Sequence, residues 1–136
     1  MCAKCTSVQP CTEQQIVCRA PHYLVIHLKR FIQMGQSIHK NKQEVTIDSF
    51  LTLANTSFAI SSVICHRGNL DSGHYYTLLR EGNNVWVQLD DESVYRGLTN
   101  EHAECKINEF AYMCIYKAIK KKYKSEESFK FKKNES

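Results

Sequence analysis

The stretch GNLDSGHYYTLLREGNNVWVQLDDESV, residues 68–94, decides the fold of this region. Two segments rich in aromatic and aliphatic residues, HYYTLLRE and NVWVQLDD, are joined through Gly-Asn-Asn at residues 82–84, a sequence that tolerates positive φ. This pattern predicts a β-hairpin. His74 begins the first strand and Asp90 ends the second, so we expect the two side chains to lie at the same end of the sheet.

A carboxylate beside an imidazole orients the ring and stabilises its charged form. Such a pair makes no bond itself but activates a nucleophile, typically a serine or a cysteine. None of the seven cysteines has the helix N-terminal setting that is typical of a reactive thiolate, and Cys65, Cys105 and Cys114 lie among apolar or strand-like neighbours. The sequence thus supplies a base and its orienting group without an evident nucleophile. The alternative is a surface histidine beside a solvated acidic loop.

Outside the hairpin, the pattern predicts a mostly antiparallel sheet of the α+β class. Strands are expected at residues 16–18, 23–31, 44–47, 57–68 and 109–118, with the strand at 23–31 in a central position. Residues 32–42 are expected to form a loop or hairpin, and residues 98–105 a short helix. Cys18 and Cys65 are interpreted as core side chains, and His27 as a hydrogen-bonded core histidine.

The composition, with 136 residues of which 43% are hydrophobic and 10% aromatic, suits one globular domain. We expect that domain at residues 1–117, followed by a basic, solvated or disordered tail at 118–136. The lysines of the tail account for the net charge of +4, so nucleic-acid binding by the folded part is disfavoured. No apolar run approaches 18 residues and no signal-peptide pattern is present, which disfavours a membrane span and secretion and favours the cytoplasm or nucleus.

The pair Cys2-x2-Cys5 offers two sulfurs to one tetrahedral zinc ion. A structural zinc site needs four ligands, and Cys11 and Cys18 are the next thiols along the chain. Because Cys18 lies in an expected strand, half of a zinc ribbon with its other Cys-x2-Cys elsewhere is favoured over a complete local site. Two surface thiols without metal are the third interpretation. Zinc is therefore expected as a structural ion only.

Taken together, the motifs resemble the C-terminal half of the ubiquitin-specific protease family, which are papain-like cysteine deubiquitinases. The matching segments are CAKC, PHYLVIHLKRF, KNKQEVTI, SSVICHRGNLDSGHYYTLLREGNNVWVQLDDESV and AYMCIY, in the family's order from Cys2 to about Tyr116. A lone Cys-x2-Cys carries little weight, but LVIHLKRF followed by SGHYYTLLR and the Trp-to-Asp-Asp segment is highly specific. The implied fold is the antiparallel palm of the protease domain, with half of its zinc-ribbon fingers.

The resemblance implies a role for each matching residue. His74 would be the general base and acid, Asp90 the group that orients it, and Asp91 a supporting polar group. The positions that would line the narrow channel for the Gly-Gly tail of ubiquitin are His66, Gly73 and Tyr75. Cys2 and Cys5 would be the second Cys-x2-Cys of the fingers, and residues 24–31 a core strand of the palm.

The chain also departs from the family pattern. The Gly-Asn-Thr-Cys-Tyr box that holds the family's nucleophile, the first Cys-x2-Cys and the helical thumb have no counterpart in the sequence. We therefore expect this chain to be inactive alone, as part of a cysteine-type ubiquitinyl hydrolase whose partners are ubiquitin and ubiquitinated proteins. A non-catalytic ubiquitin-binding or decoy protein is the first alternative. A small zinc or nucleic-acid module built on CAKC and the lysine tail is the second.

Overall fold

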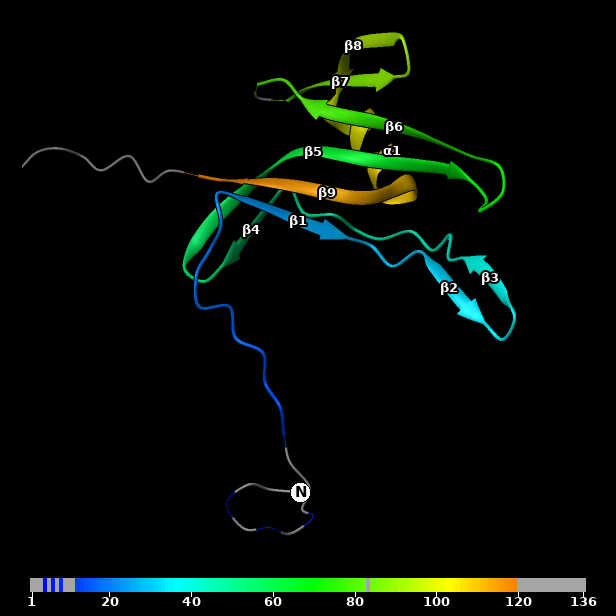
Figure 1. Cartoon of the computed structure of the whole chain (residues 1–136). Coiled ribbons are helices and arrows are strands. Elements are labelled where there is room, and N and C mark those ends of the chain that lie inside the picture. The colour runs from blue at the N-terminus through cyan, green and yellow to red at the C-terminus, as the bar shows by residue number, and fades with distance from the viewer. Residues whose placement is uncertain (1–3, 5, 7, 9–11, 83, 120–136) are drawn as a thin grey trace, which may run out of the picture.

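The computed structural model describes residues 4, 6, 8, 12–82 and 84–119. In this part of the chain nine strands and one helix form a mostly antiparallel β architecture (Figure 1). The strands are β1 (Tyr23–His27), β2 (Phe31–Met34), β3 (Ser37–Lys40), β4 (Phe50–Leu53), β5 (Thr56–Gly68), β6 (Gly73–Arg80), β7 (Val85–Asp90), β8 (Ser93–Thr99) and β9 (Ala111–Ala118), and the helix is α1 (Asn100–Phe110).

The long strand β5 organises the larger sheet, which has seven strands in the order β1-β9-β5-β6-β7-β8 with β4 also paired to β5. β5 pairs with β9 from Phe58 as far as Cys65, and with β6 from Ser62 as far as Gly68. The side chains of β5 alternate toward the core, where Phe58, Val63 and Cys65 are fully buried. Every strand pair in the sheet is antiparallel.

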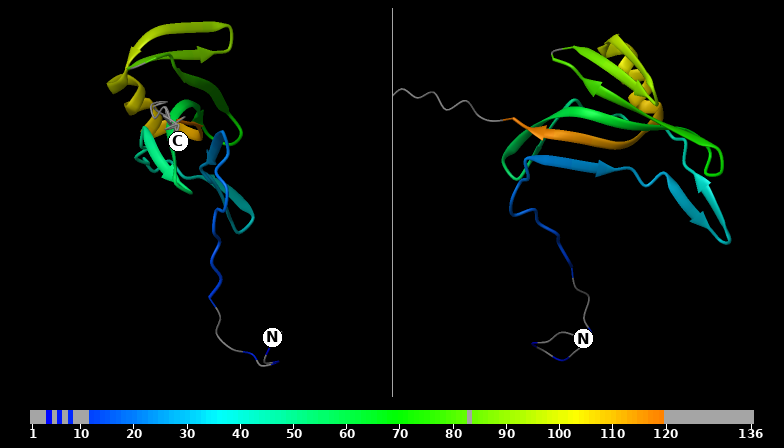
Figure 2. Two further views of the ribbon diagram at one scale, coloured as in Figure 1. Left: turned by 90° about the vertical axis from the view of Figure 1, so that its left-hand side faces the viewer. Right: turned by 45° about the horizontal axis from the view of Figure 1, so that its top comes forward.

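The helix α1 packs against β5, β7, β8 and β9 and closes the core on that side of the sheet (Figures 1 and 2). Thr99 caps its start, because the Thr99 hydroxyl accepts a hydrogen bond from the backbone N–H of His102. Ala103 and Ile107, one turn apart, are its buried residues. The helix has no stretch long and apolar enough to cross a membrane, and it is the one helix among the described residues.

The strands β2 and β3 form a separate two-stranded hairpin beyond the end of β1 (Figure 2). The chain leaves the sheet at Arg30, whose charged side chain is buried. Arg30 Nε donates to the carbonyl of Ala111 at 2.6 Å, and Nη1 donates to the carbonyls of Asn41 and Gln43. These bonds fasten both ends of the hairpin to the start of β9.

Several sequence-based predictions of the elements are confirmed: the hairpin of β6 and β7, the long strand β5, the closing strand β9, and a hairpin within residues 32–42. The predicted helix is real but runs to Phe110, so residues 109 and 110 are helical rather than extended. β8 was not predicted. Its side chains are mostly exposed, so its sequence lacks the apolar alternation by which a half-buried strand is recognised.

Other predictions are wrong. Residues 16–18 form no strand, since they pair with no other strand in the described part of the chain, and Ile16 and Cys18 are exposed. Residues 44–47 form no strand either, because Val45 donates to the carbonyl of Asn108 in α1 instead of pairing with a neighbouring strand.

The predicted strand at 23–31 is interrupted over residues 28–30, and β1 lies at the edge of the sheet rather than at its centre. His27 is exposed and contacts the Tyr112 ring edge-on, so it is not a core histidine. The edge position explains this error, since β1 is apolar on both faces but is covered on one face only. Val25 remains 57% exposed there.

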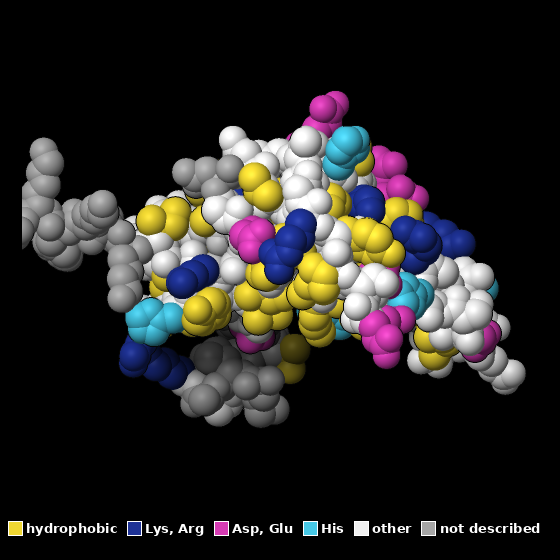
Figure 3. All heavy atoms as spheres, turned by 90° about the horizontal axis from the view of Figure 1, so that it is seen from above, with side chains coloured by type: hydrophobic (Ala, Val, Ile, Leu, Met, Phe, Trp, Pro, Cys, Tyr) yellow, Lys and Arg dark blue, Asp and Glu magenta, His cyan; other side chains and the backbone are white. Residues whose placement is uncertain are grey.

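The surface seen from above carries several exposed hydrophobic patches between charged side chains (Figure 3). On β8, Val94 and Tyr95 are more than half exposed, and on β1 so is Tyr23. Cys2, Cys5 and Cys11, and residues 120–136 of the expected tail, lie outside the described residues. The predictions made for them therefore stay predictions.

Candidate functional site

The hairpin of β6 and β7 brings His74 and Asp90 together, as its pattern predicted. His74 Nε2 lies 2.5 Å from Asp90 Oδ1, and the two side chains are 47% and 26% exposed. A carboxylate only accepts hydrogen bonds, so Nε2 carries the hydrogen and donates. In the neutral ring this leaves Nδ1 unprotonated and able to accept a proton. The contact with Asp90 thus favours one tautomer of His74.

The second oxygen of the Asp90 carboxylate is held as well. Gln88 Nε2 donates to Asp90 Oδ2 at 2.9 Å, and Lys106 Nζ donates to Gln88 Oε1 at 2.6 Å. Gln88 is buried, so its amide has little freedom to turn away. Since Lys106 lies on α1, the chain of hydrogen bonds ties the carboxylate to the helix behind the sheet. The orientation of Asp90 is therefore set by the core and not by solvent.

The pair shifts the pKa of both members. The hydrogen bond that His74 donates to Asp90 raises the pKa of His74 above the ordinary value of 6.5. The negative charges of Asp90 and Asp91 act in the same direction, whereas desolvation of the ring and the charge of Arg67 oppose the rise. The hydrogen bond from His74 lowers the pKa of Asp90 below the ordinary 3.8, and the bond from Gln88 acts in the same direction. Near neutral pH the carboxylate is therefore charged, and the imidazole is stabilised when it takes up a proton.

Asp91 lies farther from the ring than Asp90 does. Its Oδ2 is 4.0 Å from His74 Nδ1, the side chain is 79% exposed, and its backbone is left-handed with φ of 51°. With His74 and Asp90 it offers three ligand atoms within 4.8 Å of one another, an arrangement that invites comparison with a metal site. However, neighbouring ligands on a tetrahedral zinc ion at about 2.1 Å would be roughly 3.4 Å apart. The 2.5 Å contact instead indicates a hydrogen bond between His74 and Asp90.

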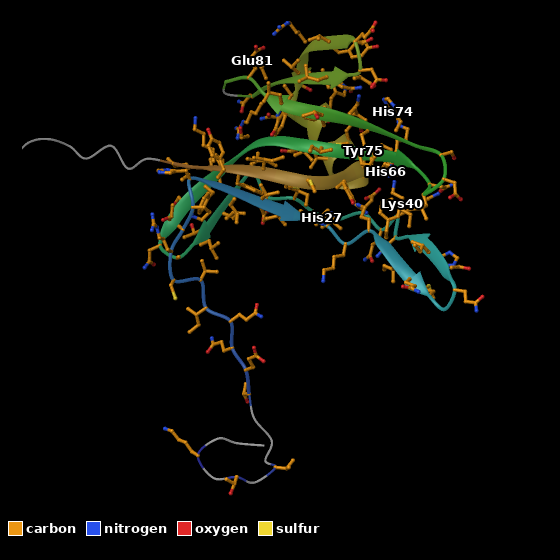
Figure 4. The ribbon with its side chains drawn as sticks, viewed as in Figure 1. His27, Lys40, His66, His74, Tyr75 and Glu81 are labelled. Atoms are coloured by element: carbon orange, nitrogen blue, oxygen red, sulfur yellow. The ribbon has the colours of Figure 1, made fainter. Side chains whose placement is uncertain are left out.

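The three residues assigned to a substrate channel by resemblance lie beside this pair, as Figure 4 shows for the labelled His66, His74 and Tyr75. The ring of His66 is 2% exposed and packs against Tyr75, with centroids 4.5 Å apart, and against Phe31 at 5.5 Å. Burial and the nearby Lys40 charge lower the pKa of His66. Gly73 leaves room for that ring, because a Cβ there would lie 2.0 Å from His66 Nε2.

The described cysteines differ sharply in their surroundings. Cys65 and Cys114 are buried, and burial raises the pKa of their thiols to about 12 and about 11. Cys18 and Cys105 are exposed. None of these four has a hydrogen bond or ion pair with His74 among the described residues. The expectation that Cys65 is a core residue is confirmed, and the one that Cys18 is packed in the core is wrong.

A thiol-labelling experiment follows from this difference. In the native chain we expect iodoacetamide to modify Cys105 and Cys18 while Cys65 and Cys114 stay unmodified, because a pKa near 12 lowers the thiolate fraction roughly a thousandfold relative to an ordinary thiol. Site-resolved mass spectrometry over time measures this. The matched control is the chain in denaturant, in which all four should react alike. Early modification of Cys65 in the native chain would contradict the buried placement.

Sequence reasoning missed Gln88, Lys106, Lys40 and Arg30 as parts of the site and its support. A signal for Gln88 was present, since it precedes Asp90 by two positions on one strand and so projects from the same face. The hydrogen bonds of Lys106, Lys40 and Arg30 span 18, 26 and 81 positions of the chain, and no local sequence pattern predicts them. These depend on tertiary structure.

Comparison with known proteins gives a consistent result. The family model for ubiquitin carboxyl-terminal hydrolase matches residues 1–116. A "Probable ubiquitin carboxyl-terminal hydrolase 16" of Schizosaccharomyces pombe is 30% identical over 125 residues, covering 85% of this chain and 26% of the relative. Ubiquitin carboxyl-terminal hydrolase 4 of Arabidopsis thaliana is 36% identical over 103 residues, covering 68% and 28%. The chain thus spans about a quarter of the length of these relatives.

Solved structures share the fold. A SAGA DUB module of Ubp8, Sgf11, Sus1 and Sgf73 bound to monoubiquitin matches with a TM-score of 0.77 at 23% identity, covering 88% of this chain and 28% of that chain. A second structure of the module, bound to ubiquitin aldehyde, matches with a TM-score of 0.66 at 20% identity, covering 74% and 25%. At these identities the likeness concerns the fold: a mostly antiparallel sheet with one helix among the described residues.

Proposed function

Because the chain belongs to the ubiquitin carboxyl-terminal hydrolase family, we propose that its folded part supplies the base and the orienting carboxylate of a cysteine-type ubiquitin hydrolase. The reaction is hydrolysis of the isopeptide or peptide bond at the C-terminus of ubiquitin. The observation that carries the proposal is the 2.5 Å bond between His74 Nε2 and Asp90 Oδ1, with Nδ1 left free to take a proton.

In this proposal His74 Nδ1 accepts the proton of a cysteine thiol, and the thiolate attacks the carbonyl carbon of the terminal glycine. Asp90 keeps the ring in one tautomer and stabilises the imidazolium that forms. His74 then returns the proton to the departing amine as the C–N bond breaks, leaving a thioester. His74 then removes a proton from a water molecule, whose oxygen attacks the thioester carbonyl. The C–S bond breaks, and His74 passes the proton to the departing thiolate, which regenerates the thiol.

The thiol, in our proposal, belongs to a part of the catalytic domain that this sequence does not contain. The buried Cys65 and Cys114 are poor candidates, because their raised pKa values keep them protonated and substrate cannot reach them. The chain alone would then be inactive, as the C-terminal portion of the protease domain. We also propose that the enzyme acts in the cytoplasm, the nucleus or both.

Substrate binding is assigned to the surface beside the catalytic pair. Gly73 lies next to His74, and its lack of a side chain lets the ring of His66 pack beside it as part of the channel proposed for the Gly-Gly segment. Tyr75 is 49% exposed, and its ring covers the buried His66, which gives the channel an aromatic wall. Cys2 and Cys5 are proposed to bind structural zinc as half of a ribbon in the fingers, together with ligands from elsewhere in the domain. No metal takes part in the proposed chemistry.

The alternative is a ubiquitin-binding protein without catalysis. The exposed side chains of β1 and β8 favour it, since they leave apolar surface available for a protein partner. The two functions differ in affinity: a surface that acts only with the rest of a catalytic domain should bind ubiquitin weakly. Titration of labelled ubiquitin with tight, saturable binding would favour the alternative.

The proposal is tested with ubiquitin carrying a C-terminal electrophile. We expect no covalent adduct on any of the seven cysteines of the purified chain, measured by intact mass and peptide mapping. Free thiol reactivity is the control, because Cys105 must still react with a small reagent in the same sample. An adduct on a cysteine of this chain, lost in a His74→Gln variant, would show that the nucleophile is here after all.

A further inference from the structure

Lys40 bonds to the strand that faces His74. Its ammonium donates to the carbonyl of His66 at 2.7 Å and to the carbonyl of Gly68 at 3.0 Å, both on β5 (Figure 4 labels Lys40 and His66). The residue between them, Arg67, is the cross-strand partner of His74. Lys40 thus holds the two carbonyls that flank the position opposite the proposed base.

These carbonyls lie where β5 loses a neighbour. Its pairing with β9 ends at Cys65 and Ala111, because the chain before Ala111 is helical, whereas its pairing with β6 continues to Gly68 and Gly73. Backbone groups of alternate residues point to the same edge of a strand, so the carbonyls of His66 and Gly68 share one edge. A strand end without a partner frays unless other donors satisfy it. The Lys40 ammonium supplies those donors.

The hairpin delivers a second contact to the same place. Phe31 is the cross-strand partner of Lys40 in the β2–β3 pair, and its ring meets the ring of His66 edge-on with centroids 5.5 Å apart. The base of the hairpin therefore holds His66 by its ring and by its carbonyl. Lys40 is itself partly buried, and burial together with the positive charges of Arg30 and Lys42 lowers its pKa. The two carbonyls that accept from this ammonium offset the unfavourable surroundings of its charge.

We infer that Lys40 is a positioning residue, which fixes the end of β5 and through the Arg67–His74 pair keeps the His74 ring on the Asp90 carboxylate. The inference rests on the proposed function only where it calls His74 the base. That Lys40 keeps the His74 ring on Asp90 is a statement about this chain by itself. Lys40 does not touch His74, so it acts through the backbone.

The test is an NMR pH titration of His74 in the full chain carrying Lys40→Met. The charged groups that face His74 are Asp90, Asp91 and Arg67, and all are retained. Loss of a nearby cation would by itself raise the pKa of a histidine, whereas loss of the Asp90 bond lowers it. We expect the His74 pKa to fall, by part of the fall seen when Asp90 is removed. The sign of the change thus separates positioning from simple electrostatics.

Matched variants complete the design. Lys40→Arg keeps a cation with donors for both carbonyls and should retain the His74 pKa. Lys42→Met removes an exposed lysine that has no hydrogen bond among the described residues, and should leave the His74 pKa unchanged. If Lys40→Met does not fold, Lys40→Gln, which is neutral and too short to reach both carbonyls, should give the same fall. An unchanged or raised His74 pKa in the folded neutral variant overturns the inference. Failure of the proposed function would appear elsewhere, as cleavage that survives His74→Gln in a complete catalytic domain containing this segment, with this titration unaffected.

Discussion

In the Asp90→Ala variant we expect the pKa of His74 to fall to or below its ordinary value of 6.5. The substitution removes the hydrogen bond to Nε2 and the negative charge, which are the effects that raise the pKa. It also frees Nε2–H and leaves the amide of Gln88 without its acceptor. In a catalytic domain that contains this segment, kcat/KM for a ubiquitin substrate should drop by about 10²- to 10⁴-fold, the usual range for losing the orientation of a general base.

Two matched variants separate the contribution of the Asp90 hydrogen bond to the His74 pKa from that of negative charge. Asp90→Asn keeps an acceptor for Nε2–H but removes the charge, so it should lower the His74 pKa while preserving the tautomer in ¹⁵N spectra. Asp91→Asn removes an equal charge 4.0 Å from the ring, at a left-handed position that Asn tolerates, and should lower the pKa much less. Equal falls in Asp91→Asn and Asp90→Ala would contradict the assignment of Asp90 as the orienting group.

The same pair gives a pH dependence of stability with a definite sign. His74 has a raised pKa in the folded chain, so its contribution is fully present below 6.5 and is lost as pH rises through the folded value. Asp90 has a lowered pKa, so its contribution is present above 3.8 and is lost as pH falls through the folded value. The pair therefore stabilises the fold most between these limits, and Asp90→Ala should flatten the profile there.

The Gly73→Ala variant is expected to lose about 1–3 kcal/mol of unfolding free energy and to displace the His66 ring. The new Cβ would lie 2.0 Å from His66 Nε2, 2.7 Å from Cε1 and 2.8 Å from the carbonyl oxygen of Asn69. The ring has little room to move, because Tyr75 and Phe31 pack against it. As His66 becomes exposed, its lowered pKa should return toward 6.5, which denaturant unfolding and NMR titration together measure.

A double mutant makes this prediction specific. In a His66→Ala background the clash with the ring is gone and only the contact with the Asn69 carbonyl oxygen remains, so Gly73→Ala should cost less than it does alone. Gly35→Asn is the control at an open glycine, because nothing lies within 4 Å of that position and Asn tolerates its φ of +65°. Equal costs for Gly73→Ala with and without the His66 ring would show that the ring does not fill this space.

The sequence predicted those features that depend on neighbours along the chain. Gly82 and Asn84, both with positive φ, lie between β6 and β7 as the hairpin pattern predicted, and the hairpin brings His74 to Asp90. It could not predict the features that depend on distant partners. Burial of Arg30 is one example, since its guanidinium bonds to a carbonyl 81 positions away. The edge position of β1 is another example, because an apolar strand sequence does not distinguish the centre of a sheet from its edge.

The central claim is that this segment performs the base function of a ubiquitin hydrolase, and a hybrid enzyme tests it most directly. Residues 1–119 of this chain would replace the matching segment of the Schizosaccharomyces pombe relative, which is 30% identical over 125 residues. We predict that the hybrid cleaves a fluorogenic ubiquitin substrate and that His74→Gln abolishes cleavage while ubiquitin binding persists. A folded hybrid that binds ubiquitin but cleaves nothing, or cleavage that survives His74→Gln, would contradict the account.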